Sequence, residues 1–234
     1  MSAFRFLREF GDGVWIADGP PVSFHGFAYP VRMTVVRLPD GGLFLHSPIA
    51  PEEGLREEVA ALGDVRCLVS PNKIHHLYLG DWKRVFPQAR LYASPGVRRR
   101  RRDLAFDADL GDQAEPEWRG VLDQLIFSGS FVMQEVVFFH RLSRTLILAD
   151  LIENFPAGHF TGVQKFVARL AGILSPDGKA PLDWRITFWN RARARQCFRQ
   201  MRAWQPENII LSHGDCYREN AGDELDRAFR WLGV

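Results

Sequence analysis

Short apolar runs alternate with amphipathic stretches through the first half of the chain. The apolar runs 33–38 and 43–45 flank an Asp-Gly-Gly turn, which favours positive φ, and together they predict a β-hairpin. A helix is expected over 51–64, with acidic residues near its start and Gly63 near its end. A strand at 65–70, a helix at 75–87 and a strand at 89–94 are expected next. This alternation is typical of an α/β domain.

The second half begins with a polar stretch, 95–117, which is rich in Arg and Asp and predicts a long surface excursion. Apolar runs at 122–129, 133–142 and 145–152 follow so closely that antiparallel neighbours are expected. The pattern over 160–204 is mostly helical, with an interruption at 175–183. A buried strand at 207–215 and a terminal helix at 223–234 complete the set. No repeat or linker divides the chain, so a single domain over 1–234 is expected.

Composition narrows the classes of function. The 234 residues are 46% hydrophobic, enough for a substantial core, and the formal net charge of +2 gives no general indication of nucleic-acid binding. The three cysteines have no CxxC spacing and are typical of reduced thiols in a cytoplasmic protein. No apolar stretch approaches the roughly 20 residues that span a bilayer, so no membrane association is expected. A homo-oligomer is left open.

Four potential metal ligands each follow an apolar run. His75 and His76 come after the run at 65–70, Asp150 after 145–149, and His213 after 208–212. In α/β sheets the side chains just beyond strand ends gather in one crevice, where ligands bind. Imidazoles with one carboxylate suit Zn, Fe or Mn. The alternative for each residue taken alone is a structural histidine or aspartate held by hydrogen bonds.

These positions resemble the metallo-β-lactamase fold, and in particular its divergent DUF4336 branch, over nearly the whole chain. The superfamily signature Thr-His-x-His-x-Asp-His matches residues 70–76, so that His76 takes the place of its last histidine and His75 that of its aspartate. Asp150 in LILAD matches the bridging aspartate, and His213 in LSHGD matches the last histidine. With the α/β pattern, the resemblance implies a four-layer αββα sandwich with a metal crevice at one edge.

The departures from the signature imply one metal where the superfamily has two. Pro71 and Lys73 occupy the places of the first two signature histidines, and the segment 127–135 lacks the third histidine of that first site. The second site would retain His75, His76, Asp150 and His213. The resemblance therefore implies one divalent metal. Zinc is the expected metal, with iron or manganese as alternatives.

Metal-dependent hydrolysis of an unknown small molecule is the expected function. A bound metal lowers the pKa of its water toward about 7 and so generates hydroxide at neutral pH. Asp150 would be a ligand and a proton acceptor. Lys73 would stabilise a developing oxyanion or hold an anionic substrate, although a solvated surface lysine explains it equally well. The alternative is a catalytically inactive member of the fold that binds a metal or ligand, or serves as an interaction module.

Three other features each have a functional and a structural interpretation. The arginine run Arg98 to Arg102 could grip phosphate or RNA, but no aromatics are interleaved with it. A solvated face paired with the nearby aspartates, or a subunit contact, is therefore favoured and nucleic acid is not expected. His46 ends an apolar run and is either structural or a support for a ligand. His159 follows Asp150 on a loop and either lines the pocket, replaces a ligand or is structural.

Overall fold

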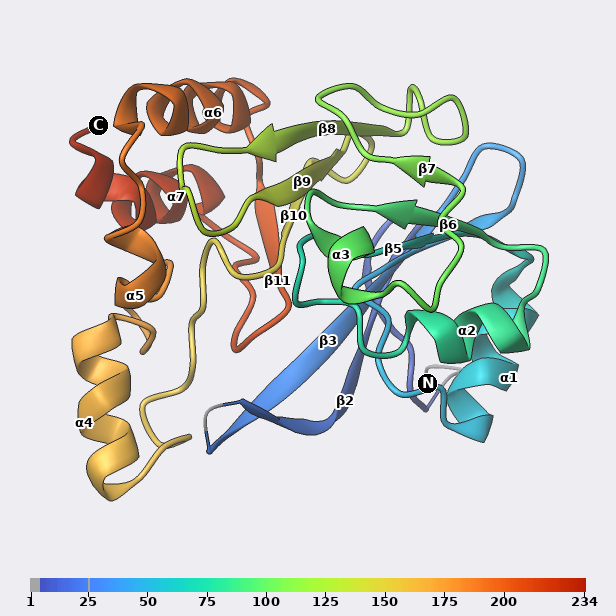
Figure 1. Cartoon of the computed structure of the whole chain (residues 1–234), viewed down its shortest axis with the longest axis horizontal. Coiled ribbons are helices and arrows are strands. Elements are labelled where there is room, and N and C mark those ends of the chain that lie inside the picture. Colours follow the sequence, from blue (N-terminus) through green and yellow to red (C-terminus); the bar gives the residue numbers. More distant parts are fainter. Residues whose placement is uncertain (1–4, 25) are drawn as a thin grey trace.

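A computed structural model describes residues 5–24 and 26–234, and two β-sheets form its centre (Figure 1). The larger sheet has seven strands in the order β1 to β7, and the smaller has four in the order β11-β10-β9-β8. The larger sheet comprises β1 (Arg8–Gly11), β2 (Val14–Phe24), β3 (Phe27–Arg37), β4 (Leu43–His46), β5 (Val65–Val69), β6 (Arg90–Ala93) and β7 (Ala108–Asp109). The smaller sheet comprises β8 (Leu122–Phe127), β9 (Glu135–His140), β10 (Thr145–Leu148) and β11 (Asn208–Leu211).

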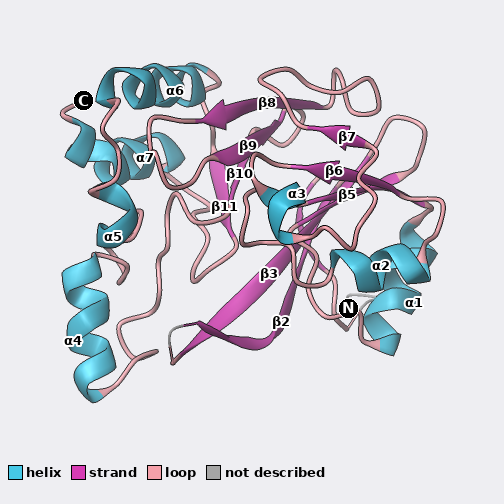
Figure 2. Ribbon diagram, in the orientation of Figure 1, coloured by secondary structure: helices cyan, strands magenta, loops and turns pink. Residues whose placement is uncertain are grey.

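Helices surround the two sheets (Figure 2). They are α1 (Glu53–Leu62), α2 (Leu79–Val85), α3 (Val97–Arg100), α4 (Gly162–Ala171), α5 (Leu182–Arg185), α6 (Arg191–Ala203) and α7 (Ala221–Phe229), with a short 3-10 turn at Arg230–Leu232. Helices α1 and α2 lie on the side of the larger sheet, and α6 and α7 lie on the side of the smaller one.

Three apolar layers separate the four layers of secondary structure. Strand β4 illustrates the arrangement, because Leu43 and Leu45 pack toward α1 and α2, while Phe44 packs toward the second sheet. Such two-sided burial follows from the period-2 alternation of a strand that lies between two covered faces. The smaller sheet packs its other face against α6 and α7, which contribute Phe198 and Phe229. The four-layer αββα sandwich is thus confirmed.

Several elements differ from their sequence-based expectations. Strands β2 and β3 form a long antiparallel hairpin, whose extent the prolines at 20, 21 and 30 obscured, and a register irregularity between Gly19 and Val22 accommodates two of them. Helix α2 begins at Leu79 and not at His75, because residues 75–78 form an irregular turn. The stretch 95–117 is not a featureless excursion, since it contains α3 and β7. The hairpin of β3 and β4 and the antiparallel order of β8, β9 and β10 are confirmed.

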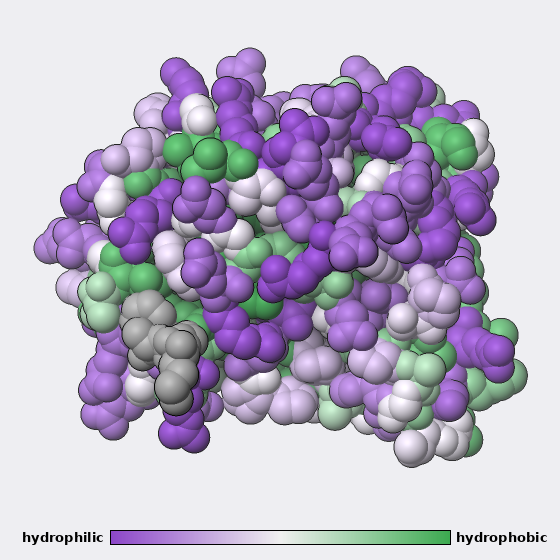
Figure 3. All heavy atoms as spheres, turned by 180° about the vertical axis from the view of Figure 1, so that it is seen from behind, coloured by the Kyte–Doolittle hydropathy of each residue, from purple (hydrophilic) through white to green (hydrophobic). Residues whose placement is uncertain are grey.

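The surface of the molecule combines hydrophilic residues with exposed hydrophobic side chains. Figure 3 shows the face opposite to that of Figure 1 covered mostly by hydrophilic residues, with separate hydrophobic patches. No helix in the described part of the chain is both long enough and apolar enough to cross a lipid bilayer.

The sheet order brings the predicted site residues to one edge. Strands β4 and β5 run parallel, as do β10 and β11, so that the loops after β5, β10 and β11 start from the carboxyl ends of parallel pairs. These are the loops that carry His75, Asp150 and His213.

Candidate metal centre

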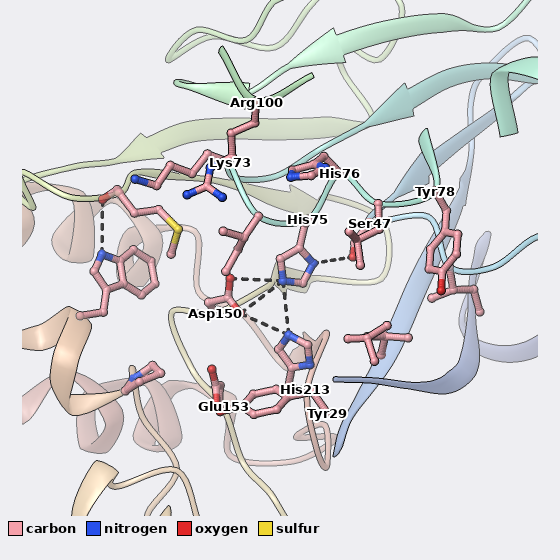
Figure 4. A pocket seen from close by; sticks show the side chains of 18 of the residues that line it. Tyr29, Ser47, Lys73, His75, His76, Tyr78, Arg100, Asp150, Glu153 and His213 are labelled. Atoms are coloured by element: carbon pink, nitrogen blue, oxygen red, sulfur yellow. Dashed lines mark hydrogen bonds and ion pairs between the residues drawn. The ribbon is translucent and has the colours of Figure 1, made fainter. Parts of the chain in front are cut away.

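Three of the four predicted ligands come together. Atoms of His75, Asp150 and His213 that could bind a metal all lie within 4.8 Å of one another. The Nε2 atoms of the two histidines are 3.3 Å apart. Each also lies 3.2 Å from Oδ1 of Asp150. Figure 4 shows the three side chains converging at the floor of a pocket.

This triangle has the dimensions of one face of a metal-binding tetrahedron. Tetrahedral coordination with bonds of about 2.0–2.1 Å places ligand atoms about 3.3–3.4 Å apart. The three edges of the triangle measure 3.2, 3.2 and 3.3 Å. Two imidazole nitrogens and one carboxylate oxygen also form a donor set that zinc, iron and manganese accept. The residues therefore fit a divalent metal.

The outer nitrogen of each histidine is held by a polar group. Nδ1 of His213 donates to the carbonyl oxygen of Pro30 at 2.7 Å, and Nδ1 of His75 lies 2.7 Å from Oγ of Ser47. A proton on Nδ1 leaves the lone pair of a neutral imidazole on Nε2, the atom that faces the triangle. Ser47 has a φ of 52°, a left-handed conformation that is uncommon outside glycine and that directs its hydroxyl to the site.

Asn72 shapes the loop that presents His75. Its Oδ1 accepts from the backbone N–H groups of Ile74 and His75, at 3.0 and 3.2 Å. Its Nδ2 donates to Oδ2 of Asp150 at 2.7 Å and to Oε2 of Glu135 at 3.1 Å. Every hydrogen-bonding capacity of this buried amide is used. One side chain thus folds the signature loop and ties it to Asp150.

Glu135 orients Asp150 through the backbone. Its carboxylate accepts from the N–H groups of Ala149 and Asp150, both at 2.8 Å, and it is fully buried. Burial and the nearby charge of Asp150 raise the pKa of Glu135 to about 8, although the N–H donors oppose the shift. Glu135 therefore fixes the start of the loop that carries Asp150.

The charges within the triangle support one another. Burial opposes ionisation of Asp150, but the charges and hydrogen bonds of His75 and His213 outweigh it and hold the pKa of Asp150 well below its usual range. Burial also opposes protonation of His213, yet the hydrogen bond and charge of Asp150 raise the pKa of His213 to about 9. A cation at this position, whether a proton or a metal, is therefore stabilised.

The loop that carries His213 is joined to the loop after Asp150. The N–H of Asn154 donates to the carbonyl of His213 at 3.2 Å, and the N–H of Asp215 donates to the carbonyl of Asn154 at 2.8 Å. Between them, Gly214 has a φ of +84°, and a Cβ there would lie 2.1 Å from the carbonyl oxygen of Asn154. Only glycine permits this approach. The Gly in LSHGD thus serves the packing of the two loops.

His76 and Lys73 do not join the triangle. His76 is half-buried beside Arg100 and outside the group of three, and its Nδ1 has no hydrogen-bond partner among the described residues. Burial, followed by the charge of Arg101, lowers the pKa of His76. Lys73 points toward Val132, to whose carbonyl it donates at 2.5 Å. The structure thus presents a three-ligand set where the sequence predicts four.

His46 and His159, which the sequence also singled out, lie outside the triangle. His46 is fully buried, packs its ring against Phe138, and has no hydrogen-bond partner for either ring nitrogen among the described residues. It therefore forms neither the structural hydrogen bond nor the ligand support considered from sequence. His159 reaches the carbonyl of Ala28 and does not line the pocket.

A cavity of about 540 Å³ opens above the triangle. Its lining is mainly apolar, with the cations Lys73 and Arg100 on one side and Glu153 on the other (Figure 4). Glu153 is buried, and its Oε2 has no hydrogen-bond partner among the described residues. Burial raises the pKa of Glu153 to about 8, although the charge of His213 opposes the shift. A mainly apolar pocket with a few convergent polar groups is the common form of a small-molecule site.

Comparison with known proteins identifies the fold. Residues 12–99 match the family described as a domain of unknown function, DUF4336. No curated protein matches the sequence. A metallo-β-lactamase from Hirschia baltica superposes with a TM-score of 0.63 at 15% identity, over 97% of this chain and 96% of that one. The FIM-1 metallo-β-lactamase of Pseudomonas aeruginosa, solved in a mono-zinc form, gives 0.62 at 13% identity, over 97% and 94%.

A flavodiiron protein from Giardia intestinalis gives a TM-score of 0.71 at 13% identity, over 99% of this chain but 60% of that one. The class of protein is therefore the metallo-β-lactamase fold. The chain has this fold at low sequence identity, and its residues 12–99 carry the DUF4336 match, as the sequence resemblance predicts.

The residues that support the triangle were not predicted from the sequence. In the sequence, Glu135 resembles an ordinary strand residue and Asn72 an ordinary turn residue. Ser47 resembles the end of a strand. A buried Glu at the start of an otherwise apolar strand is the one signal that could have been noticed, since acids are almost never fully buried without partners.

Proposed function

We propose that this protein is a metal-dependent hydrolase that holds a single metal through His75, Asp150 and His213. The triangle of ligand atoms with edges of 3.2–3.3 Å, at the floor of a cavity of about 540 Å³, supports the proposal most strongly. The fold neighbours include proteins whose names state a mono-zinc form or iron. Zinc is the metal we propose, and iron or manganese would satisfy the same donor set.

The metal would act as a Lewis acid and lower the pKa of a bound water. The residues of the chain have separate tasks around it. Asp150 is a ligand, and its Oδ2 is kept in place by Asn72. Ser47 and Pro30 hold the histidine rings so that Nε2 faces the metal position. Lys73 and Arg100 supply positive charge on one side of the pocket.

The loss of the first metal site argues for one metal. Lys73 occupies a position where the superfamily signature has a histidine, and its ammonium is bonded to Val132. Pro71 occupies the position of the other signature histidine, and its carbonyl oxygen accepts a hydrogen bond from the N–H of Val136. Two-metal catalysis clamps both the attacking and the leaving oxygen. A single metal lacks this clamp, so a binding module without turnover is the competing function.

Metal content and turnover test the proposal together. Purified protein incubated with zinc and then desalted should retain about one zinc per chain. Asp150→Asn should retain close to none. Asp183→Asn is a matched control, since Asp183 lines the same cavity outside the triangle. A wild-type protein without metal, unchanged by Asp150→Asn, would sink the metal site.

A hydrolysis screen then separates the enzyme from the binding module. Esters, lactones and phosphodiesters would be tested with metal-loaded wild type and with Asp150→Asn as the background. Turnover above that background supports the hydrolase. Retained metal without turnover favours the binding module.

A further inference from the structure

A second cavity lies beside the first and shares a wall with it. Its volume is about 490 Å³, and Lys73, Arg100, Val132 and Met133 line both cavities. The remaining lining residues come from the start of α3 and from the loop between β8 and β9. A molecule that occupies the first cavity can therefore extend toward the second.

The charges around the second cavity are all positive. Lys73, Arg99 and Arg100 line it, and no Asp or Glu is among the described residues that do so. Neighbouring arginines of the same run are neutralised, because Arg98 pairs with Asp109 and Arg101 with Asp103. The run thus contains two arginines with acidic partners, Arg98 and Arg101, and two that line a cavity, Arg99 and Arg100, whereas Arg102 is exposed and, among the described residues, does neither.

The two cavity-lining arginines have unused donors. Among the described residues, neither Arg99 nor Arg100 forms a hydrogen bond or an ion pair with another side chain. Lys73 uses one of its three donors on the carbonyl of Val132. Figure 4 shows Arg100 beside Lys73, with both on the side of the pocket away from Glu153. A guanidinium group binds phosphate through two parallel N–H···O hydrogen bonds. The three positive charges are enough to neutralise a phosphate dianion.

We propose that Lys73, Arg99 and Arg100 form a subsite for a phosphate group at the non-reacting end of the substrate. The apolar wall of Val132 and Met133 would contact the body of the same molecule between this subsite and the triangle. The place of this phosphate in a hydrolysed substrate rests on the proposed function, whereas the subsite itself does not require the metal.

A small organic phosphate fits these features better than RNA does. The cations line a cavity rather than an extended groove, and Phe131 is the one aromatic residue among the described residues that line it. Single-stranded nucleic acid is usually bound by successive aromatic platforms along a basic groove.

Titration of the metal-free protein with inorganic phosphate tests the subsite. Binding would be followed calorimetrically in the presence of EDTA, with acetate as the comparison anion. Loss of a charge-assisted bond of about 1.4 kcal/mol or more gives a loss of about tenfold in affinity. That loss is expected for Arg99→Gln and for Arg100→Gln. Arg102→Gln is the matched control, because Arg102 belongs to the same run, is exposed and does not line the cavity.

The outcomes separate this proposal from the metal site. Phosphate affinity that survives Asp150→Asn, is lost with Arg99→Gln and Arg100→Gln, and is kept by Arg102→Gln supports the subsite. Equal weakening by all three arginine substitutions, or an acetate affinity equal to that of phosphate, overturns it. An RNA oligomer that binds with steep salt dependence and depends equally on Arg102 also overturns it.

Discussion

The Nε2 atoms of His75 and His213 face each other at 3.3 Å, while the Nδ1 atom of each ring is engaged on its far side. When both rings are neutral and carry their protons on Nδ1, the two Nε2 lone pairs point at the same place. Such an arrangement is unfavourable unless a cation lies between the lone pairs, and Asp150 completes the site with a negative charge. The outer hydrogen bonds thus decide which atoms can be ligands.

The first prediction distinguishes the two adjacent histidines. His75→Ala should weaken zinc binding by more than the roughly 10–100-fold typical of losing a supporting residue, because it removes a ligand. His76→Ala should leave the affinity nearly unchanged, since His76 lies outside the triangle. Competition with a chromophoric zinc chelator measures both. Equal losses in the two variants would restore the four-ligand set predicted from sequence and contradict the three-ligand set.

The second prediction concerns Glu135. Glu135→Gln keeps the shape but turns one acceptor oxygen into an NH₂ group that faces the N–H donors of Ala149 and Asp150. Zinc affinity should fall by about 10–100-fold, the usual effect of losing a group that orients a ligand. Glu153→Gln is the control, because Glu153 is also buried beside the site but is not bonded to the backbone of Asp150. A larger effect from Glu153→Gln would show that Glu135 does not orient the ligand.

The residues of the triangle were predictable because each follows an apolar run whose end the sequence marks. Asp150 and His213 come directly after buried strands, and parallel neighbours bring their ends together. Which of His75 and His76 faces the site was not predictable, since it depends on how Asn72 bends the loop through its side chain. The contact of Glu135 with Asp150 also lay beyond sequence reasoning, because it joins residues on different strands through backbone N–H groups.

Two features of the fold also depended on detail that the sequence does not contain. The hairpin of β2 and β3 contains prolines that interrupt an alternating pattern, and a register irregularity that sequence does not reveal absorbs them. The arginine run was predicted to be a solvated face paired with nearby aspartates, or a subunit contact. The pairing is found for Arg98 and Arg101, whereas the place of Arg99 and Arg100 in a cavity wall was not predicted. The periodicity of a run four to five residues long does not determine the direction of each side chain.

The third prediction is a pH dependence of stability caused by His46. Burial, with the charge of His75, lowers the pKa of His46 to about 3, whereas the charge of Asp150 opposes the shift. In the unfolded chain its pKa is about 6.5. As the pH falls below about 6.5, the unfolded chain takes up a proton that the folded protein refuses, so stability is lost by about 1.4 kcal/mol per pH unit down to about pH 3.

His46→Leu should remove that part of the slope. Urea unfolding of the metal-free protein at several pH values measures the slope, and the difference between wild type and His46→Leu reports the contribution of His46. His159→Leu, at an exposed ring outside the pocket, serves as the control. An unchanged slope in His46→Leu would show that the buried ring does not resist protonation.

The fourth prediction concerns the glycine that joins the two ligand loops. Gly214→Ala places a Cβ 2.1 Å from the carbonyl oxygen of Asn154, and neither backbone can move without shifting His213 relative to Asp150. Gly120→Ala is a matched control with a similar φ of +90° and nothing within 4 Å of its Cβ. Gly120→Ala should lower the free energy of unfolding only by the conformational cost of about 1–2 kcal/mol. Gly214→Ala should lose more stability than this control in urea unfolding and should also lose zinc affinity. Equal stability losses in the two variants, with zinc affinity kept, would mean that the close approach of the loops does not set the distance between the carboxylate and the last histidine.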